Sequence, residues 1–274
     1  MEELLTQENF TLLCCLIFGL IFGSFLSACI YRVPREISLS NPPRSFCTSC
    51  DRKLNWWENI PVLSWTFLRG RCLCKKNKIS VRYPLVEIMS GMSALASYIY
   101  YGLNPTGIVI YILLAALITI TFIDFDFKII PDVISLPGIV IGLAIGIVSQ
   151  YFPIFSKPPI TSGVIDSLIG FVVGGGSLYA IGYIYYFATG QIGLGGGDIK
   201  LLALVGSLMG WQVIPVAIFV GSMTGSIVGV VTMIAQRSGR QTEIPFGPWL
   251  SLGIVFYIFN IYGAQSIFGL LNGF

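Results

Sequence analysis

Long apolar segments alternate with shorter polar ones along almost the whole chain. The first apolar run extends from about residue 10 to residue 30, and a polar stretch follows it up to residue 84. Seven further apolar runs lie at roughly 84–101, 107–125, 133–151, 165–188, 200–211, 213–235 and 248–270. Because roughly 20 apolar residues are needed to cross a bilayer as a helix, this pattern predicts an all-α, polytopic membrane protein with about eight transmembrane helices. The run at 200–211 is short for a membrane span.

The same pattern divides the chain into three parts. Residues 1–30 are predicted to be the first transmembrane helix, residues 31–84 a polar loop and residues 85–274 a transmembrane domain. The first nine residues carry three glutamates and no basic residue, which is the opposite charge order from that of a secretory signal peptide. The first helix is therefore expected to remain as an anchor.

Basic residues concentrate in the polar loop, which contains eleven Lys and Arg residues against three Asp and Glu. Basic loops beside membrane helices stay in the cytoplasm, so the loop is predicted to be cytoplasmic and the N-terminus to lie on the other side. With eight helices, the other cytoplasmic loops hold Lys128, Lys200, Arg237 and Arg240, and the opposite side holds only Lys157. The excess is typical of topology and of contact with anionic lipid rather than of nucleic-acid binding.

The amino-acid composition limits which side chains this protein could use for catalysis. The 274 residues are 55% hydrophobic and 11% charged, and none of them is histidine. A Ser-His-Asp triad, a Cys-His pair, an HExxH zinc site and a His-ligated haem are therefore excluded. Any reaction must use carboxylates, thiols, hydroxyls or lysines.

Two aspartates are placed where their carboxyl groups can act together. Asp124 ends the third predicted helix and Asp198 opens the sixth, both on the cytoplasmic side. Acids at the edge of a hydrocarbon layer are costly unless they are paired or functional. Two carboxyl groups that share a proton can hydrolyse a peptide bond, because the ionised one activates water while the protonated one polarises the carbonyl. Asp124 and Asp198 are therefore the candidate catalytic residues. Asp126 would lie about 200° round the helix from Asp124, on another face.

Three glycines precede the second aspartate. Gly195, Gly196 and Gly197 would let a substrate strand approach the backbone next to Asp198, and they permit the dihedral angles of an unwound helix start. They are therefore the candidate substrate-binding residues. As a nucleotide-binding loop the run is unconvincing, because it follows no predicted strand and lacks both the GxGxxG phase and the Walker lysine.

The chain resembles a known family. Gly195–Asp198 fits the GxGD signature of intramembrane aspartyl proteases, and the remainder is similar to the type IV prepilin peptidases. The similarity is carried, in the family's order, by Gly23–Phe25, Tyr31–Arg35, Cys47–Cys50, Asn59–Trp65, Arg82–Glu87, Ile123–Asp124, Ile130–Asp132, Gly197–Lys200 and Ile244–Pro248. These stretches are spread over nearly the whole chain, so the match is specific, whereas GxGD alone would be weak.

The resemblance implies a bifunctional enzyme of the bacterial inner membrane. It would cut the basic leader from prepilins and pseudopilins after a glycine at the cytoplasmic face, and then N-methylate the new N-terminus with S-adenosylmethionine. By position, the resemblance assigns catalysis to Asp124 and Asp198 and makes residues 85–274 the peptidase domain. The family context also suggests a methyl-transfer site in the basic loop, with Glu58 and Glu87 among the few acids there. Glu87 can equally be a charge at a helix entry.

Four cysteines lie close together in the loop. Cys47 and Cys50 form CxxC, and Cys72 and Cys74 form CxC. A reducing cytoplasm favours a tetrahedral zinc site over disulfides, and a zinc ion with four protein ligands would be structural. The family pattern is CxxC twice, so the last cysteine is displaced here by one position.

Two other functions use the same features. A transporter or channel could bind a cation or relay protons at Asp124 and Asp198, with glycine-broken helices around them. Transporters usually hold their ion near the middle of the bilayer, whereas these carboxylates are predicted at one face. A zinc-bearing scaffold without catalysis would leave the two aspartates unexplained. The particular prepilin and the oligomeric state do not follow from the sequence.

Overall fold

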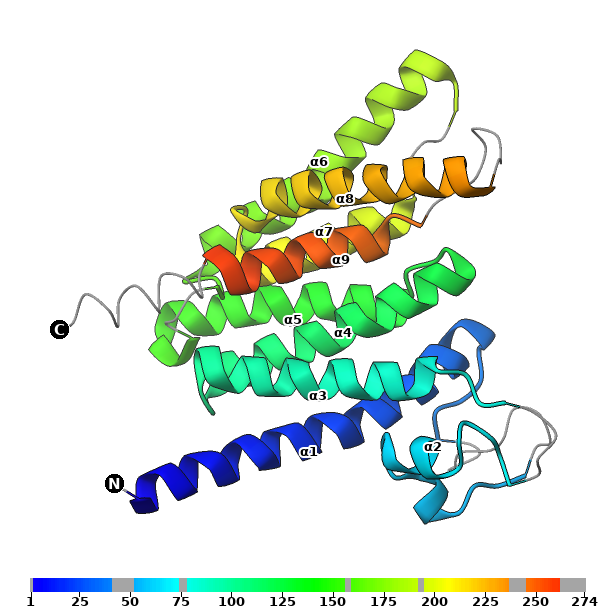
Figure 1. The fold of residues 1–274 in the computed structure, drawn as a ribbon. Helices are drawn as coiled ribbons and strands as arrows, with labels where there is room; N and C mark the ends of the chain where they lie inside the picture. Colours follow the sequence, from blue (N-terminus) through cyan, green and yellow to red (C-terminus); the bar gives the residue numbers. More distant parts are fainter. Residues whose placement is uncertain are drawn as a thin grey trace. The chain divides into compact units, whose positions relative to one another are not determined.

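The computed structural model describes residues 2–40, 52–73, 78–155, 159–191, 195–236 and 245–261 (Figure 1). Within these ranges the eight long helices are α1 (Glu2–Arg32), α3 (Arg82–Tyr101), α4 (Pro105–Phe127), α5 (Asp132–Tyr151), α6 (Val164–Thr189), α7 (Gly196–Met209), α8 (Val213–Gln236) and α9 (Gly247–Phe256). Shorter turns of helix are α2 (Leu63–Phe67), the 3₁₀ turns η1 (Val33–Arg35), η2 (Trp56–Asn59) and η3 (Pro153–Phe155), and the π turn η4 (Tyr257–Ile261). The predicted all-α class is confirmed.

Each of the eight apolar runs contains one of these helices, and in the last run, expected over 248–270, α9 ends at Phe256 and η4 at Ile261. By length and apolar composition, five of those in the described ranges can cross a membrane, namely α1, α4, α5, α6 and α8. Helix α7 has 14 residues, as expected from its short apolar run. The chain forms two compact units, residues 1–119 and 120–274, so α4 belongs to both. The boundaries predicted at residues 30 and 84 stay predictions.

In the first unit, α1 and α3 pack side by side through small residues (Figure 1). A Cβ atom added to Gly23 would lie 2.6 Å from the Cα atom of Glu87, and one added to Gly19 would lie 2.7 Å from the Cβ atom of Ala94. Small residues at such contacts let the backbones of membrane helices approach closely. The contact brings the end of α1 against the start of α3, where Glu87 lies.

Helix α4 joins this pair through a polar and aromatic contact. The hydroxyl groups of Ser90 and Tyr111 are 3.0 Å apart and buried. The rings of Phe18 and Phe22 each lie 5.8 Å from the Tyr111 ring, centroid to centroid. The buried phenol therefore has a hydrogen-bond partner at one end and aromatic neighbours around its ring.

In the second unit, α7 is surrounded by other helices. Every residue from Leu201 to Met209 is buried. On α6, a Cβ atom added to Gly170 would overlap the carbonyl oxygen of Gly206, and Ser167 donates a hydrogen bond of 2.6 Å to the carbonyl of Ser207. Because its neighbours enclose it, α7 does not need the roughly 20 residues that a helix surrounded by lipid needs to cross the bilayer.

Helices α5 and α8 use glycine in the same way. A Cβ atom on Gly138 of α5 would overlap the Leu204 side chain of α7. Gly225 of α8 lies against the Trp249 ring of α9, where an added Cβ would be 3.0 Å from Cδ1. The glycines spaced along the apolar runs therefore mark helix contacts.

Two glycines of α6 provide a matched test of this packing. A Cβ atom at Gly174 would overlap the carbonyl oxygen of Leu202 on α7, whereas one at Gly176 would meet nothing within 4 Å. Gly174→Ala should lower the free energy of unfolding by about 1–3 kcal/mol because α6 and α7 must separate. Gly176→Ala should leave it unchanged or raise it by up to about 1 kcal/mol, since alanine is the better helix former. Equal unfolding curves for the two variants in detergent would contradict the packing described.

Candidate active site

Asp124 lies at the end of α4, four residues before the backbone turns. Lys128 has a left-handed φ of 55°, and its N–H donates to the carbonyl of Asp124 at 2.9 Å, which closes the helix. The Asp124 side chain is 5% exposed. Its Oδ2 accepts a hydrogen bond of 3.0 Å from the backbone N–H of Gly247, at the start of α9. A carboxylate oxygen is thus held by a backbone donor from a segment far along the chain.

Asp198 lies in the first turn of α7 and is 8% exposed. Helix α7 begins after Gly195, whose backbone is extended with φ −74° and ψ 139°. Asp198 therefore lies at the start of α7 with its carboxyl group buried.

Ile130 packs against two glycines, one next to Asp198 and one hydrogen-bonded to Asp124. A Cβ atom added to Gly197, next to Asp198, would lie 2.9 Å from the Cβ atom of Ile130, and one added to Gly247 would lie 3.2 Å from its Cδ1 atom. Gly247 is the residue that holds Asp124. The ends of α4, α7 and α9 therefore meet around one buried isoleucine, and the charge of Asp124 acts on Asp198.

The other acids of this region are placed differently. Asp126 is exposed, in line with its expected position on another face of α4. Asp132, the first residue of α5, forms an ion pair of 2.6 Å with Lys200 of α7, and both side chains are partly exposed. An exposed pair contributes at most about 1 kcal/mol, so its effect is to tie the start of α7 to the start of α5. Lys200 is thereby neutralised two residues from Asp198.

The three candidate substrate-binding glycines have different surroundings. Gly197 packs against Ile130, so a side chain there is excluded by the fold itself. Gly196 has nothing within 4 Å of an added Cβ atom, and at Gly195 such an atom would be 3.4 Å from Oδ2 of Asp198. Open backbone beside the carboxyl group is therefore found at Gly195 and Gly196.

The cysteine cluster is described only in part. Cys47, Cys50 and Cys74 lie outside the described residues. Cys72 is 3% exposed, and its Sγ atom accepts a hydrogen bond of 3.7 Å from Nη2 of Arg52. A cationic guanidinium group therefore lies beside the one loop cysteine that the structure describes. In the described part of the chain no three Cys, His, Asp or Glu side chains are grouped as metal ligands.

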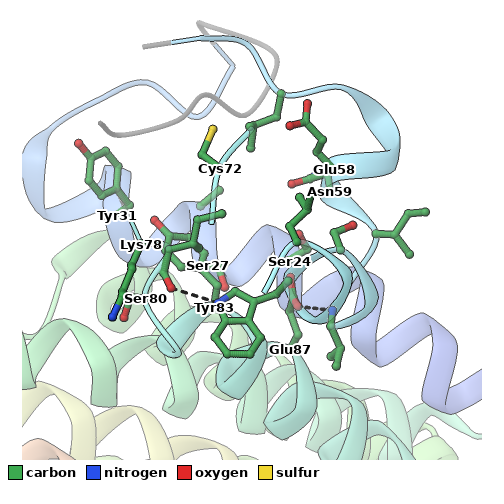
Figure 2. A pocket seen from close by; sticks show the side chains of 18 of the residues that line it. Ser24, Ser27, Tyr31, Glu58, Asn59, Cys72, Lys78, Ser80, Tyr83 and Glu87 are labelled. Atoms are coloured by element: carbon green, nitrogen blue, oxygen red, sulfur yellow. Dashed lines mark hydrogen bonds between the residues drawn. The ribbon is translucent and has the colours of Figure 1, made fainter. Parts of the chain in front are cut away.

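A cavity in the first unit is lined by Glu58 of the loop and Glu87 of α3. It has a volume of about 320 Å³ and lies among the end of α1, the segment from Leu54 to Ile79 and the start of α3 (Figure 2). Glu58 closes a capping box with Asn55 and forms an ion pair of 2.5 Å with Arg52. Burial acts to raise the pKa of Glu58, but the hydrogen bonds from Arg52 and the Asn55 amide outweigh it and hold the pKa below its ordinary value.

Gly247 received no role from the sequence, where it stood only within a matched stretch. Glu87 was named with Glu58 for the methyl-transfer site, with a charge at a helix entry as the alternative. Glu87 is 7% exposed and accepts a hydrogen bond of 2.7 Å from the N–H of Val62. In the sequence, Gly247 is a lone glycine at a predicted helix start, followed by proline, and this feature could have indicated it. The feature that could have indicated Glu87 is an acid inside an apolar run.

Fold and site together define a class of protein, a polytopic helical membrane protein that gathers two aspartates from distant helices into one buried cluster. Comparison with known proteins narrows this class. Residues 17–101 match the bacterial peptidase A24 N-terminal domain, and residues 111–230 match the type IV leader peptidase family.

Proteins named prepilin leader peptidase/N-methyltransferase are similar over most of the chain. The protein from Pseudomonas putida is 37% identical, with 86% of each chain covered. The protein from Stutzerimonas stutzeri is 36% identical over 88% of this chain and 87% of its own, and the one from Neisseria gonorrhoeae is 33% identical over 92% and 91%. No solved structure matches the chain. The chain therefore belongs to the type IV leader peptidase family, and nothing in these comparisons supports the transporter alternative.

The contact between Gly247 and Asp124 can be tested by one methyl group. A Cβ atom at Gly247 would lie 2.7 Å from Oδ2 of Asp124, so Gly247→Ala must displace the carboxylate and weaken its hydrogen bond. We expect a loss of about 1–3 kcal/mol in the free energy of unfolding, measured in detergent. Gly196→Ala, at an open position, should change it by less than about 0.5 kcal/mol. If Gly247→Ala were as stable as the wild type, the tight contact would not exist.

Proposed function

We propose that this protein is a membrane-embedded aspartic endopeptidase that removes the leader peptide of type IV prepilins and pseudopilins, and then N-methylates the new N-terminus with S-adenosylmethionine. The observation that carries the peptidase half is the cluster of Asp124 and Asp198 around Ile130, buried and joined to α9 through Gly247. The names of the relatives support both halves.

In this proposal the two carboxyl groups share one proton and have different roles. The Gly247 N–H stabilises negative charge on Asp124, so we assign Asp124 as the ionised base. It takes a proton from water as the water oxygen bonds to the scissile carbonyl carbon. Asp198 donates its proton to the carbonyl oxygen. The carbon–nitrogen bond then breaks as the carbonyl group re-forms and returns a proton to Asp198, and the leaving amine takes the proton that Asp124 had accepted.

The substrate strand would approach along Gly195 and Gly196. Both positions leave the backbone open next to Asp198, whereas Gly197 is occupied by Ile130. A close approach of backbone to backbone places a peptide bond within reach of a carboxyl group that is itself buried. We therefore assign substrate contact to Gly195 and Gly196, and a packing role to Gly197 that keeps Asp198 in place.

We propose that this cluster faces the cytoplasm of a bacterial inner membrane. The excess of Lys and Arg in residues 31–84 supports this orientation. With that orientation, a prepilin whose apolar segment lies in the bilayer would present its basic leader at the cytoplasmic ends of α4 and α7. Anionic lipid is then the natural neighbour of the basic loop, and no nucleic-acid partner is proposed.

Replacing either aspartate by its uncharged isostere tests the mechanism. Asp124→Asn and Asp198→Asn should each abolish cleavage of a purified prepilin in detergent, because one asparagine cannot complete the proton exchange, with a loss of about 10⁴-fold or more. Methylation of a pre-cleaved pilin should continue in both variants, since it needs other groups. Cleavage is measured by gel shift of the substrate.

Asp126→Asn is the matched control, because this neighbouring acid is exposed. It should cut at the wild-type rate. Normal processing by Asp124→Asn or Asp198→Asn would refute the two-carboxyl mechanism. In sealed vesicles, cleavage of a leader presented only to the face opposite the basic loop would refute the proposed orientation.

We also propose that Cys47, Cys50, Cys72 and Cys74 bind one structural zinc ion. The buried position of Cys72 beside Arg52 supports a thiolate ligand there. Elemental analysis should then give about one zinc per chain, and the Cys47→Ser, Cys50→Ser double variant should lose it. The Cys14→Ser, Cys15→Ser double variant, altered in α1, should keep its metal. Equal metal content in both double variants would disprove the site.

A further inference from the structure

Two short helical turns of the polar loop expose large apolar side chains. In η2, Trp56 is 81% exposed and Trp57 is also exposed, and in α2, Phe67 is 82% exposed and Leu63 is exposed as well. We call these four residues the aromatic face. They belong to neither α1 nor α3, so they are not the lipid-facing side of a membrane helix. Apolar patches of this kind mark contact with a protein or with a membrane surface.

Helix α2 presents its apolar residues to the outside. Leu63 and Phe67 are four residues apart, so they lie on one side of the helix. Thr66 lies on the same side and is exposed, and its hydroxyl donates to the carbonyl of Val62 at 2.9 Å. Thr66 therefore satisfies its donor within the helix and adds a methyl group to the apolar side.

The opposite side of α2 is fixed to its surroundings. Ser64 is buried and donates a hydrogen bond of 2.6 Å to the carbonyl of Trp57, which joins α2 to η2. Trp65 donates from Nε1 to the carbonyl of Ile79 at 3.1 Å, and a Cβ atom on Gly70 would lie 2.9 Å from the Trp65 ring. Turning α2 to bury its apolar side would break these contacts, so the aromatic face is held outward by the fold.

The start of α2 lies beside the membrane helices rather than beyond their ends. The N–H of Val62, the residue before α2, donates to Glu87 at 2.7 Å, and Ser24 also forms a hydrogen bond with Glu87. Glu87 is five residues into α3, which is about 7.5 Å along the helix axis. Ser24 is six residues before the apolar run of α1 ends at residue 30, which is about 9 Å. Helix α2 therefore begins at the level of the apolar part of α1 (Figure 1).

This level corresponds to the membrane surface. Helix α1 is long and apolar enough to cross a bilayer. The headgroup layer on each side of the hydrocarbon is roughly 5–8 Å deep, so a segment beside the end of the apolar run lies in that layer or against it. Tryptophan is enriched there, because its ring contacts acyl chains while its N–H group stays hydrated.

Basic side chains flank the aromatic face along the chain. Lys53 precedes η2, Arg69 and Arg71 follow α2, and all three are exposed. Among the described residues, no Asp or Glu forms an ion pair with them. Anionic lipid headgroups can supply the counter-charge. Apolar side chains with cations beside them match the two layers of a membrane surface, acyl chains below and charged headgroups above.

We infer that the aromatic face inserts into the headgroup layer of the membrane that α1 crosses, with Lys53, Arg69 and Arg71 against anionic lipid. Lipid already surrounds α1 at this level, whereas a protein partner would have to displace headgroups to reach the same face. The contact gives the loop a third attachment besides its connections to α1 and α3. The inference depends on α1 crossing the membrane and on neither of the proposed reactions.

Tryptophan fluorescence of the full chain in vesicles tests this inference. The vesicles contain zwitterionic and anionic phospholipid, with or without a nitroxide on the headgroup, which quenches only nearby indoles. Subtracting the spectrum of the Trp56→Phe, Trp57→Phe double variant from that of the wild type removes the contribution of the other tryptophans, Trp65, Trp211 and Trp249. The difference spectrum should be shifted to the blue, quenched about twofold or more by the nitroxide lipid, and protected from iodide in the water.

Charge placed on α2 should remove the contact. In the Leu63→Glu, Phe67→Glu background, nitroxide quenching of the Trp56 and Trp57 signal should fall by about half or more, because glutamate resists transfer out of water. Leu103→Glu is the matched control, since this exposed leucine follows the other end of α3, and it should behave as the wild type. These side chains are exposed, so the melting temperature in detergent should not change.

The basic residues are tested separately from the apolar ones. Arg69→Gln, Arg71→Gln should reduce nitroxide quenching in vesicles that contain anionic lipid, and high salt should do the same to the wild type. Quenching that was the same in anionic and zwitterionic vesicles, and insensitive to salt, would remove anionic lipid from the inference.

Other results would overturn the inference as a whole. Quenching of the Trp56 and Trp57 signal by iodide and not by the nitroxide lipid would place the aromatic face in water. Protection from both quenchers would mean that protein covers it, a second copy of the chain if dilution with lipid removes the protection and this chain itself if it does not. If the tryptophan variant did not fold, nitroxide quenching of the whole spectrum would be compared between the wild type and Leu63→Glu, Phe67→Glu, and equal quenching would refute the contact.

Discussion

The hydrogen bond from the Gly247 N–H to Asp124 sets the arrangement of the second unit, because it fixes a buried carboxyl group against a helix more than a hundred residues away. It can form only because residue 247 has no side chain, and the same absence lets Ile130 reach both Gly247 and Gly197. Burying an acid without a donor would be costly, so the contact decides where α9 can begin. The position of Asp198 then follows from the position of Ile130.

The helices could be predicted because the apolar run that indicates each helix lies within one continuous stretch of sequence. Each apolar run contains a helix, and even the short run at 200–211 corresponds to one of 14 residues, although α9 ends at Phe256 within a run expected over 248–270. Its brevity has a physical reason that the sequence alone did not supply: α7 is enclosed by α5 and α6, which approach through Gly138, Gly170 and Gly174. Which helix each of these glycines faces could not be predicted from the sequence.

What the sequence did not reveal depends on contacts between distant segments. Gly247 and Glu87 lie in stretches that the sequence analysis had singled out, but the group that reaches each from another segment could not be predicted, the Asp124 carboxylate in one case and the Val62 N–H in the other. The three glycines before Asp198 also differ in a way that the sequence did not reveal. Because they form one motif, all three were expected to bind substrate, whereas in the structure Gly197 packs against Ile130 and Gly196 has nothing within 4 Å of an added Cβ atom.

The absence of histidine gives both sites a common character. Carboxyl groups are prominent in both, and the difference between the sites lies in what surrounds those groups. In the second unit the charge of Asp124 acts on Asp198, and in the proposed mechanism the two acids share a single proton. In the first unit Glu87 accepts hydrogen bonds from the Val62 N–H and the Ser24 hydroxyl, and among the described residues no Lys or Arg forms an ion pair with it. Burial and hydrogen-bond partners, rather than the side chain itself, therefore decide what each carboxyl group can do.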